Sequence, residues 1–243
     1  MIGKIINFGM KISNHYFVSL PKFRNELNKF KQLSGNNIII EPYPILNDMA
    51  STTPFDRDYM YHPSWAARKI AQINPEIHVD IGSTLILPAI LSAFIPTEFY
   101  DYRPADIKLS NLKSGQADLM NLHFKNNSIK SLSCLSTIEH IGLGRYGDPL
   151  NANGDKKAMS ELSRVLAKGG DLLIAVPVGT PRVIFNAHRI YSYDQIIDNF
   201  KDLELVEYSL IKTSGTDGIL VNPKNKNPNI SSYDCGCFWF KKK

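Results

Sequence analysis

The sequence predicts an α/β fold in which a doubly wound, mostly parallel sheet ends in an antiparallel carboxyl-terminal strand and follows an amino-terminal helical arm. Short apolar runs typical of buried strands alternate with helix-like runs after residue 61. Such alternation places parallel strands between two layers of helices. Two extended runs with no helix between them finish the chain, which predicts an antiparallel end to the sheet.

The first 60 residues are expected to form a helical arm and a wrapping segment. Apolar residues recur near helical spacing from residue 17 to residue 33 among Lys, Arg and Asn, and Gly35 ends the run. A loop with three prolines follows. Packing of this amphipathic arm on its own domain is the favoured interpretation, and contact with a membrane surface or a partner helix is the alternative.

Residues 61–243 are expected to form one domain. At 243 residues, of which 43% are hydrophobic, the chain can bury one substantial core. A helix is predicted from Pro63, a residue type that the first helical turn accepts. The later elements are predicted as a strand at 77–81, a helix at 89–94, strands at 98–102 and 131–135, a helix at 156–166, a strand at 172–176, and two late strands at 203–211 and 233–240.

The composition argues against several classes of function. No apolar run reaches the roughly 18 residues that a spanning helix needs, and the amino terminus lacks the apolar block of a secretory signal. We therefore expect a soluble, cytoplasmic protein with no stable membrane span. The net charge of +5 favours an acidic partner, but no basic helix or interleaved aromatic run typical of nucleic-acid binding is present.

The three cysteines predict neither a disulfide framework nor a metal site. Their number is odd, and Cys235 and Cys237 are too close in sequence to close a useful loop. No second Cys or His pair lies at zinc-ligand spacing, so packing in the core is expected of Cys134 and of the later pair.

Two predicted strands end in residues suited to a nucleotide. Doubly wound sheets bind ligands at the carboxyl ends of their strands, where Asp80 could hold a cationic amino group and Gly82 would let backbone approach a ligand. About twenty residues later, Asp101 ends the next strand beside Tyr102 and Arg103. A carboxylate there is placed to accept both hydroxyls of a ribose. An ordinary strand end remains the alternative for the first of these motifs.

Three further segments extend this pattern. Asp118 and Leu119 precede a Leu-His-Phe run, residues 132–140 hold an apolar strand that leads through Ser136 to a Glu-His pair, and residues 162–177 hold a helix end, a glycine pair and a strand. In this order the segments resemble the motifs of class I S-adenosylmethionine-dependent methyltransferases, over about residues 61–240. The resemblance implies a Rossmann-like fold with S-adenosyl-L-methionine as cofactor.

The resemblance also implies roles for single residues. Asp118, with Leu119 beside it, takes the position that meets the adenine amino group, and Ser136 lies in the turn after the fourth strand. Ser83 begins a Ser-Thr-Leu run that stands where the family usually has glycines. We expect its hydroxyl to donate to the cofactor carboxylate in their place.

The acceptor is expected at the loops over the methyl donor. Residues 61–68, 140–149 and 185–189 are similar to a less characterised subgroup that is associated with bacterial surface-polysaccharide pathways. This resemblance implies a methyltransferase that O-methylates a sugar or another small polar acceptor. A phosphorylated or nucleotide-linked sugar would also suit the positive net charge.

Candidate catalytic residues lie in these same loops. A hydroxyl acceptor must lose a proton, and an imidazole with a pKa near 6.5 can take it at neutral pH. His140 and His188 are the candidate bases, although each would also fit as an ordinary hydrogen-bonded loop histidine. The remaining candidates are an acidic pair that could orient a histidine or bind a metal, and a basic pair that could hold a phosphate or carboxylate of the acceptor: Glu139 and Asp148, and Arg145 and Arg189.

Two other functions remain open at this point. An NAD-dependent sugar-modifying enzyme shares the early strands and the ribose carboxylate, but it would want a glycine triad that this chain lacks. A non-catalytic S-adenosylmethionine-binding module is the second alternative, because the Ser-Thr-Leu run at residues 83–85 departs from the glycines of the family.

Overall fold

The computed structural model describes residues 19–35, 38–46, 48–226 and 233–243. The chain divides into two units, Met1–Phe55 and Asp56–Lys243. In the first unit residues 19–34 are helical, so the predicted amino-terminal helix is present. The predicted start of that helix, at residues 17 and 18, lies outside the described residues. All the sites discussed below belong to the second unit.

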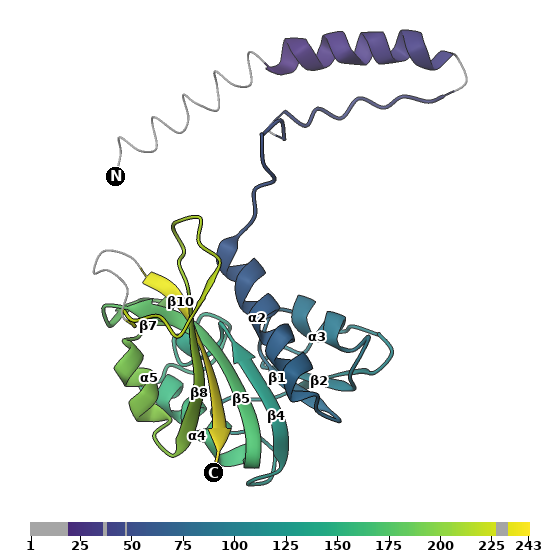
Figure 1. The fold of residues 1–243 in the computed structure, drawn as a ribbon. Coiled ribbons are helices and arrows are strands. Elements are labelled where there is room, and N and C mark those ends of the chain that lie inside the picture. Colours follow the sequence, from purple (N-terminus) through teal and green to yellow (C-terminus); the bar gives the residue numbers. More distant parts are fainter. Residues whose placement is uncertain (1–18, 36–37, 47, 227–232) are drawn as a thin grey trace. The chain divides into compact units, whose positions relative to one another are not determined.

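An eight-stranded sheet organises the second unit (Figure 1). Its strand order is β3-β2-β1-β4-β5-β10-β8-β9, and β10 pairs antiparallel with both β5 and β8. The first five strands in this order pair in parallel, which confirms the mostly parallel sheet with an antiparallel carboxyl-terminal strand. The strands are β1 His78–Ile81, β2 Thr97–Asp101, β3 Leu112–Gln116, β4 Ile129–Leu135, β5 Leu166–Gly179, β8 Leu203–Ile211, β9 Ile219–Val221 and β10 Tyr233–Lys242.

Helices cover both faces of this sheet. Figure 1 shows α2 and α3 on one side, and α4 and α5 on the other. The bounds are α2 Arg57–Ile73, α3 Ile86–Leu91, α4 Gly154–Val165 and α5 Tyr193–Asn199, with a short helix η2 Ile138–His140 and a separate hairpin of β6 Arg182–Ile184 and β7 His188–Ile190. Among the described residues no helix is long and apolar enough to cross a membrane.

The core follows the alternation of side chains along β10. Cys235, Cys237 and Trp239 pack with Trp65 of α2 on one face, whereas Phe238 packs on the face that α4 and α5 cover. This is the two-residue period of a strand buried on both faces. All three cysteines of the chain are buried and free.

The helix that leads into the sheet begins earlier than predicted. α2 starts at Arg57 because the carboxylate of Asp56 caps it, accepting a hydrogen bond from the backbone N–H of Tyr59 at 3.1 Å. Asn74, in the left-handed conformation, ends the helix. The first turn of α2 therefore carries Asp58 and Tyr59 to the carboxyl edge of the sheet, where they help to line a pocket.

Candidate active site

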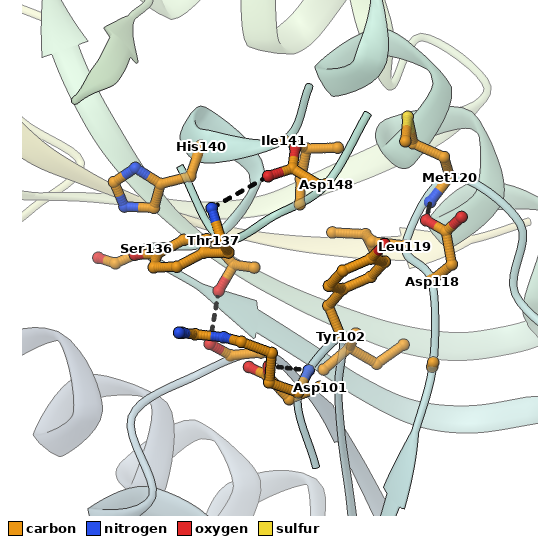
Figure 2. Close-up of a pocket in the computed structure, with 15 residues that line it drawn as sticks. Asp101, Tyr102, Asp118, Leu119, Met120, Ser136, Thr137, His140, Ile141 and Asp148 are labelled. Atoms are coloured by element: carbon orange, nitrogen blue, oxygen red, sulfur yellow. Dashed lines mark hydrogen bonds between the residues drawn. The ribbon is translucent and has the colours of Figure 1, made fainter. Parts of the chain in front are cut away.

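Two adjoining pockets lie at the carboxyl edge of the sheet. The first, which we call the strand-end pocket, lies where β1, β2 and β4 end and where the loop after β3 begins. Figure 2 shows its labelled residues around one space: Asp101 and Tyr102 from β2 and its end, Asp118 to Met120 from the loop after β3, and Ser136, Thr137 and His140 from the segment after β4.

Backbone hydrogen bonds fix two of the three carboxylates that line the strand-end pocket, those of Asp101 and Asp118. Asp101 Oδ1 accepts from the N–H of Arg103 at 2.8 Å, and Asp118 Oδ1 accepts from the N–H of Met120 at 2.8 Å. Both side chains are half-buried. Leu119 and Ile141 supply apolar walls. A space with apolar walls and these two oriented carboxylates is suited to a base and a sugar that present hydrogen-bond donors.

The loop after η2 closes another side of the strand-end pocket. The guanidinium of Arg103 lies 4.4 Å above the ring of Tyr146. Asp148 accepts from the N–H of Gly142 at 2.7 Å and from the N–H of Tyr146 at 3.2 Å. Both oxygens of Asp148 thus hold the shape of this loop, and Asp148 also lines the pocket.

Gly82 and Thr137 form a close contact at the floor of the strand-end pocket. Gly82 has φ 73°, and a Cβ there would lie 2.5 Å from Thr137 Cγ2. The hydroxyl of Thr137 also donates to the carbonyl of Gly82 at 2.7 Å. The positive φ and the close approach of Thr137 each require glycine at this position, whether or not a ligand is bound. Ser136, at φ 52°, adopts a left-handed conformation that non-glycine residues seldom take.

Two expected cofactor residues are directed elsewhere. Asp80 and Ser83 are buried and are absent from the described lining of the strand-end pocket. Asp80 accepts from the N–H of Ser83 at 3.2 Å and from the hydroxyl of Ser133, and burial raises the pKa of Asp80 to about 6. The Ser83 hydroxyl accepts from the N–H of Leu135 at 3.0 Å. Both side chains therefore join β1 to β4, and the expectation that they point toward the cofactor is wrong.

The second pocket, which we call the histidine pocket, shares Ser136 and His140 with the first. Several segments that lie far apart in sequence build its walls. They are the first turn of α2, η2 and its following loop, β5, β7 and the start of β10, and they contribute Asp58, Tyr59, Glu139, Arg145, Pro177, His188, Tyr233, Asp234 and Cys235. Sequence reasoning missed Asp58, Tyr59, Tyr233 and Asp234.

The geometry around His140 defines its tautomer. Its Nδ1 lies 2.6 Å from the carbonyl oxygen of Ala187, which can only accept, so Nδ1 carries the proton and Nε2 carries the lone pair. Arg145 Nη1 donates to the same carbonyl at 3.1 Å. Burial, more than any other cause, lowers the pKa of His140 to about 4. His140 is therefore neutral at physiological pH, with Nε2 able to accept a proton.

Glu139 lies directly beside this nitrogen. Its Oε1 is 3.8 Å from His140 Nε2, and the residue is 2% exposed. Its Oε2 has no hydrogen-bond partner among the described residues. Burial raises the pKa of Glu139 to about 8, so the carboxyl is protonated at neutral pH. Glu139 can thus donate a hydrogen bond within this pocket.

His188 and Arg189 differ although they are neighbours on β7. The ring of His188 lies 6.4 Å from that of His140, and its buried Nε2 has no hydrogen-bond partner within the described part of the chain. Burial lowers the pKa of His188. Arg189 instead donates to the carbonyl of Ile141 at 2.6 Å and lies 3.5 Å from Asp155. Since these partners hold its guanidinium inside the protein, the expectation that Arg189 grips the acceptor is wrong.

Within the described ranges no group of three or more His, Cys, Asp or Glu side chains is arranged to hold a metal ion.

Comparison with known proteins establishes the fold. Residues 98–214 match the family described as Caenorhabditis protein of unknown function, DUF268. No curated protein matches. The structure is similar to an S-adenosylmethionine-dependent methyltransferase from Clostridium acetobutylicum, with 14% identity and a TM-score of 0.51 over 77% of this chain and 93% of that one.

Two other solved structures show how far this likeness reaches. Geranyl diphosphate methyltransferase, solved in complex with SAM, is 10% identical with a TM-score of 0.53, over 74% of this chain and 85% of that one. The cyclase SpnF is 11% identical with a TM-score of 0.50, over 74% and 80%. The fold is therefore the Rossmann-like fold of methyltransferases, and reaction and substrate must be argued from the site.

Proposed function

We propose that the chain is an S-adenosylmethionine-dependent methyltransferase that methylates a hydroxyl of a small polar acceptor. The observation that carries the proposal is the junction of two pockets at Ser136 and His140. One pocket has the carboxylates and apolar walls that suit a nucleoside, and the other has a neutral histidine with a free lone pair. A group-transfer enzyme needs its donor and its acceptor to meet at such a junction.

The strand-end pocket would hold the cofactor. Asp101, at the end of β2, is placed to accept from the ribose hydroxyls, and Asp118 to accept from the adenine amino group. Leu119 and Ile141 would contact the base. Tyr102, Arg103, Gly82 and Ser136 complete this set among the expected cofactor residues.

The histidine pocket would hold the acceptor. S-adenosylmethionine supplies a methyl group already activated by its sulfonium. As the acceptor oxygen bonds to the methyl carbon and the carbon–sulfur bond breaks with its electron pair left on sulfur, Nε2 of His140 receives the hydroxyl proton. His140 is the better base of the two candidates because the Ala187 carbonyl fixes its tautomer. Arg145 positions His140 by sharing that carbonyl.

A sugar is the first class of acceptor to test. The support is the resemblance of residues 61–68, 140–149 and 185–189 to a subgroup associated with surface-polysaccharide pathways. The polar lining of the histidine pocket, with hydroxyl, carboxyl and imidazole groups, is compatible with a polyhydroxylated molecule.

The proposal is tested by a product screen. Sugars and activated sugars are incubated with the protein and S-adenosylmethionine carrying an isotopically labelled methyl group, and products are read by mass spectrometry. We expect a labelled O-methylated product that is strongly reduced with the Asp101→Ala variant. Tight binding of S-adenosylhomocysteine with no labelled product from any acceptor would instead support a non-catalytic binding module.

A further inference from the structure

Carboxyl groups outnumber cations in the histidine pocket. Among its described lining residues are Asp58, Glu139 and Asp234, against the single cation Arg145. His140 and His188 add no charge at neutral pH, because burial lowers the pKa of each. This local charge is opposite in sign to the net charge of the chain, which is +5.

Asp58 and Asp234 converge on one neighbour. The N–H of Thr213 donates to Asp234 Oδ1 at 3.1 Å, and the hydroxyl of Thr213 lies 3.2 Å from Asp58 Oδ2. The two carboxyls come from α2 and β10, so the fold brings them together across a large separation in sequence. Burial is the main cause that raises the pKa of Asp58, and the charges of Asp56 and then of Asp234 raise it further. A cation bound at this pair would relieve their repulsion.

The neighbouring cations are committed elsewhere. Arg145 donates to the carbonyl of Ala187 and lies 5.1 Å from the ring of Tyr146. Lys212 pairs with Asp217 at 3.0 Å, and the guanidinium of Arg57 donates to the carbonyl of Lys212 at 3.1 Å. The charge of Arg57 still lowers the pKa of Asp58, and that of Lys212 lowers the pKa of Asp234, but within the described residues neither cation forms an ion pair with these carboxyls.

A second observation indicates that the histidine pocket binds a polar ligand: two buried polar atoms in it have no hydrogen-bond partner among the described residues. Glu139, 2% exposed, lines it with an Oε2 that lacks a hydrogen-bond partner among the described residues. The buried Nε2 of His188 is in the same situation. Two phenol rings, of Tyr59 and Tyr233, also line the pocket. Aromatic rings combined with carboxylates are a recurring environment for ammonium groups.

From this arrangement we infer that the acceptor carries a protonated amine beside its hydroxyl groups, as an amino sugar does. The ammonium would bind at Asp58 and Asp234, and the hydroxyl to be methylated would lie at His140. The inference rests on the proposed function for the acceptor role of the histidine pocket. It replaces the phosphorylated acceptor that the net charge favours, because a phosphate would face the carboxyls of Asp58 and Asp234 here.

Matched ring probes test this inference while the acceptor itself is still unidentified. We would titrate aminocyclohexanol, vicinal cyclohexanediol and hydroxycyclohexanecarboxylate by saturation-transfer NMR, with and without S-adenosylhomocysteine. The three molecules share a ring and a hydroxyl and differ in carrying a cation, no charge or an anion. We expect the amine to bind about 10-fold to 100-fold more tightly than the diol, the range for a charge-assisted hydrogen bond. The carboxylate should bind most weakly.

Variants of the two carboxyls test whether the preference for the amine arises at Asp58 and Asp234. Asp58→Asn and Asp234→Asn should each reduce the preference for the amine, and the double variant should abolish it, because asparagine keeps the shape and removes the charge. Asp106→Asn, which changes a highly exposed carboxyl that is not among the described lining residues of the pocket, should leave the preference intact. A folded double variant that still prefers the amine would overturn the inference, as would equal binding of amine and diol or no binding of any probe.

The two proposals fail in different ways. Binding of S-adenosylhomocysteine, measured on the same preparation, reports on the strand-end pocket. If it binds and the amine preference is absent, only the acceptor class is wrong. If S-adenosylhomocysteine does not bind, the methyltransferase proposal is wrong. The probe titrations without S-adenosylhomocysteine still decide whether the pocket prefers the amine.

Discussion

The strand-end pocket and the histidine pocket are neighbours that the fold builds in different ways. The strand-end pocket takes most of its residues from the ends of β1, β2 and β4 and from the loop after β3, in chain order, and the loop after η2 closes it. The histidine pocket joins the start of α2, the segment after β4, β7 and the start of β10. A site at successive strand ends follows from local spacing, whereas the second site depends on the antiparallel insertion of β10 between β5 and β8.

The two pockets also differ in the state of their ionisable groups. Asp101 and Asp118 are half-buried, and backbone N–H groups fix them, which suits recognition of a ligand. Glu139 and His140 are buried, and burial makes both neutral at physiological pH. Buried neutral groups that can give or take a proton are suited to acid–base catalysis. Mutations of Asp101 and Asp118 should therefore alter cofactor affinity, whereas mutation of His140 should alter turnover.

The largest effect should come from His140. His140→Ala should lower the turnover number by about 100-fold to 10,000-fold, because a proton acceptor of the transition state is lost. Affinity for S-adenosylhomocysteine should change little. His123→Ala is the matched control, since that ring packs against Tyr100 and Phe124. Near-normal turnover in both His140→Ala and His188→Ala would exclude a histidine base.

The pH profile sharpens this prediction. With the pKa of His140 lowered to about 4, the base is already unprotonated across the ordinary histidine range. The rate should thus change little between about pH 5.5 and pH 7 and should fall only as the pH approaches 4. Single-turnover rates measured with a proven acceptor check this. A tenfold rise in rate centred near the ordinary histidine pKa would show that the base is not His140 with its lowered pKa.

Asp101 should give the next largest effect. Asp101→Ala should weaken S-adenosylhomocysteine binding by about 1.5 to 3 kcal/mol, the cost of a lost charge-assisted hydrogen bond. The control Asp106→Ala removes a highly exposed carboxyl from the loop that follows. An unchanged dissociation constant in folded Asp101→Ala would remove Asp101 from the cofactor site.

Glu139 should affect stability as well as chemistry. Its folded pKa, about 8, lies above its ordinary value of 4.5, so its contribution to folding is fully present below pH 4.5 and is lost as the pH rises through 8. Glu139→Gln should be more stable than the parent by about 1 to 3 kcal/mol at pH 8.5 and nearly equal to it near pH 4.5. Urea unfolding at both pH values measures this, with exposed Glu204→Gln as control. An identical stability difference at the two pH values would contradict the raised pKa.

Asp118 should give the smallest effect. Asp118→Asn keeps an oxygen that can accept from the adenine amino group and from Met120, so S-adenosylhomocysteine binding should weaken by only about 0.5 to 1.5 kcal/mol. A loss larger than that of Asp101→Ala in the same calorimetric series would reverse the ranking of the two carboxylates.

The sequence predicted the framework well because β-strands with apolar side chains leave clear patterns. The late strand at residues 203–211 coincides with β8, and the predicted start of the last strand coincides with that of β10. β3 was missed because its residues, Leu-Lys-Ser-Gly-Gln, form a polar edge strand. α5 was also missed, although its capping box between Ser192 and Gln195 is visible in the sequence.

The site was predictable where it follows the strand ends. Asp101, Asp118, Ser136 and His140 all line the strand-end pocket. Asp80 was expected at the cofactor because it lies near the carboxyl end of β1. Its place in the sequence does not reveal the direction of its side chain, which accepts a hydrogen bond from Ser133. The acidic pair of the histidine pocket leaves no local signal, because α2 and β10 meet only in the folded chain.

The central claim is that the strand-end pocket binds an S-adenosyl nucleoside, and calorimetric titration tests it most directly. S-adenosylhomocysteine and NAD would be titrated into the full chain and into the Asp101→Ala variant. We expect binding of S-adenosylhomocysteine that weakens in the variant, with little or no binding of NAD. Comparable binding of NAD, or no binding of S-adenosylhomocysteine by the folded chain, would contradict it.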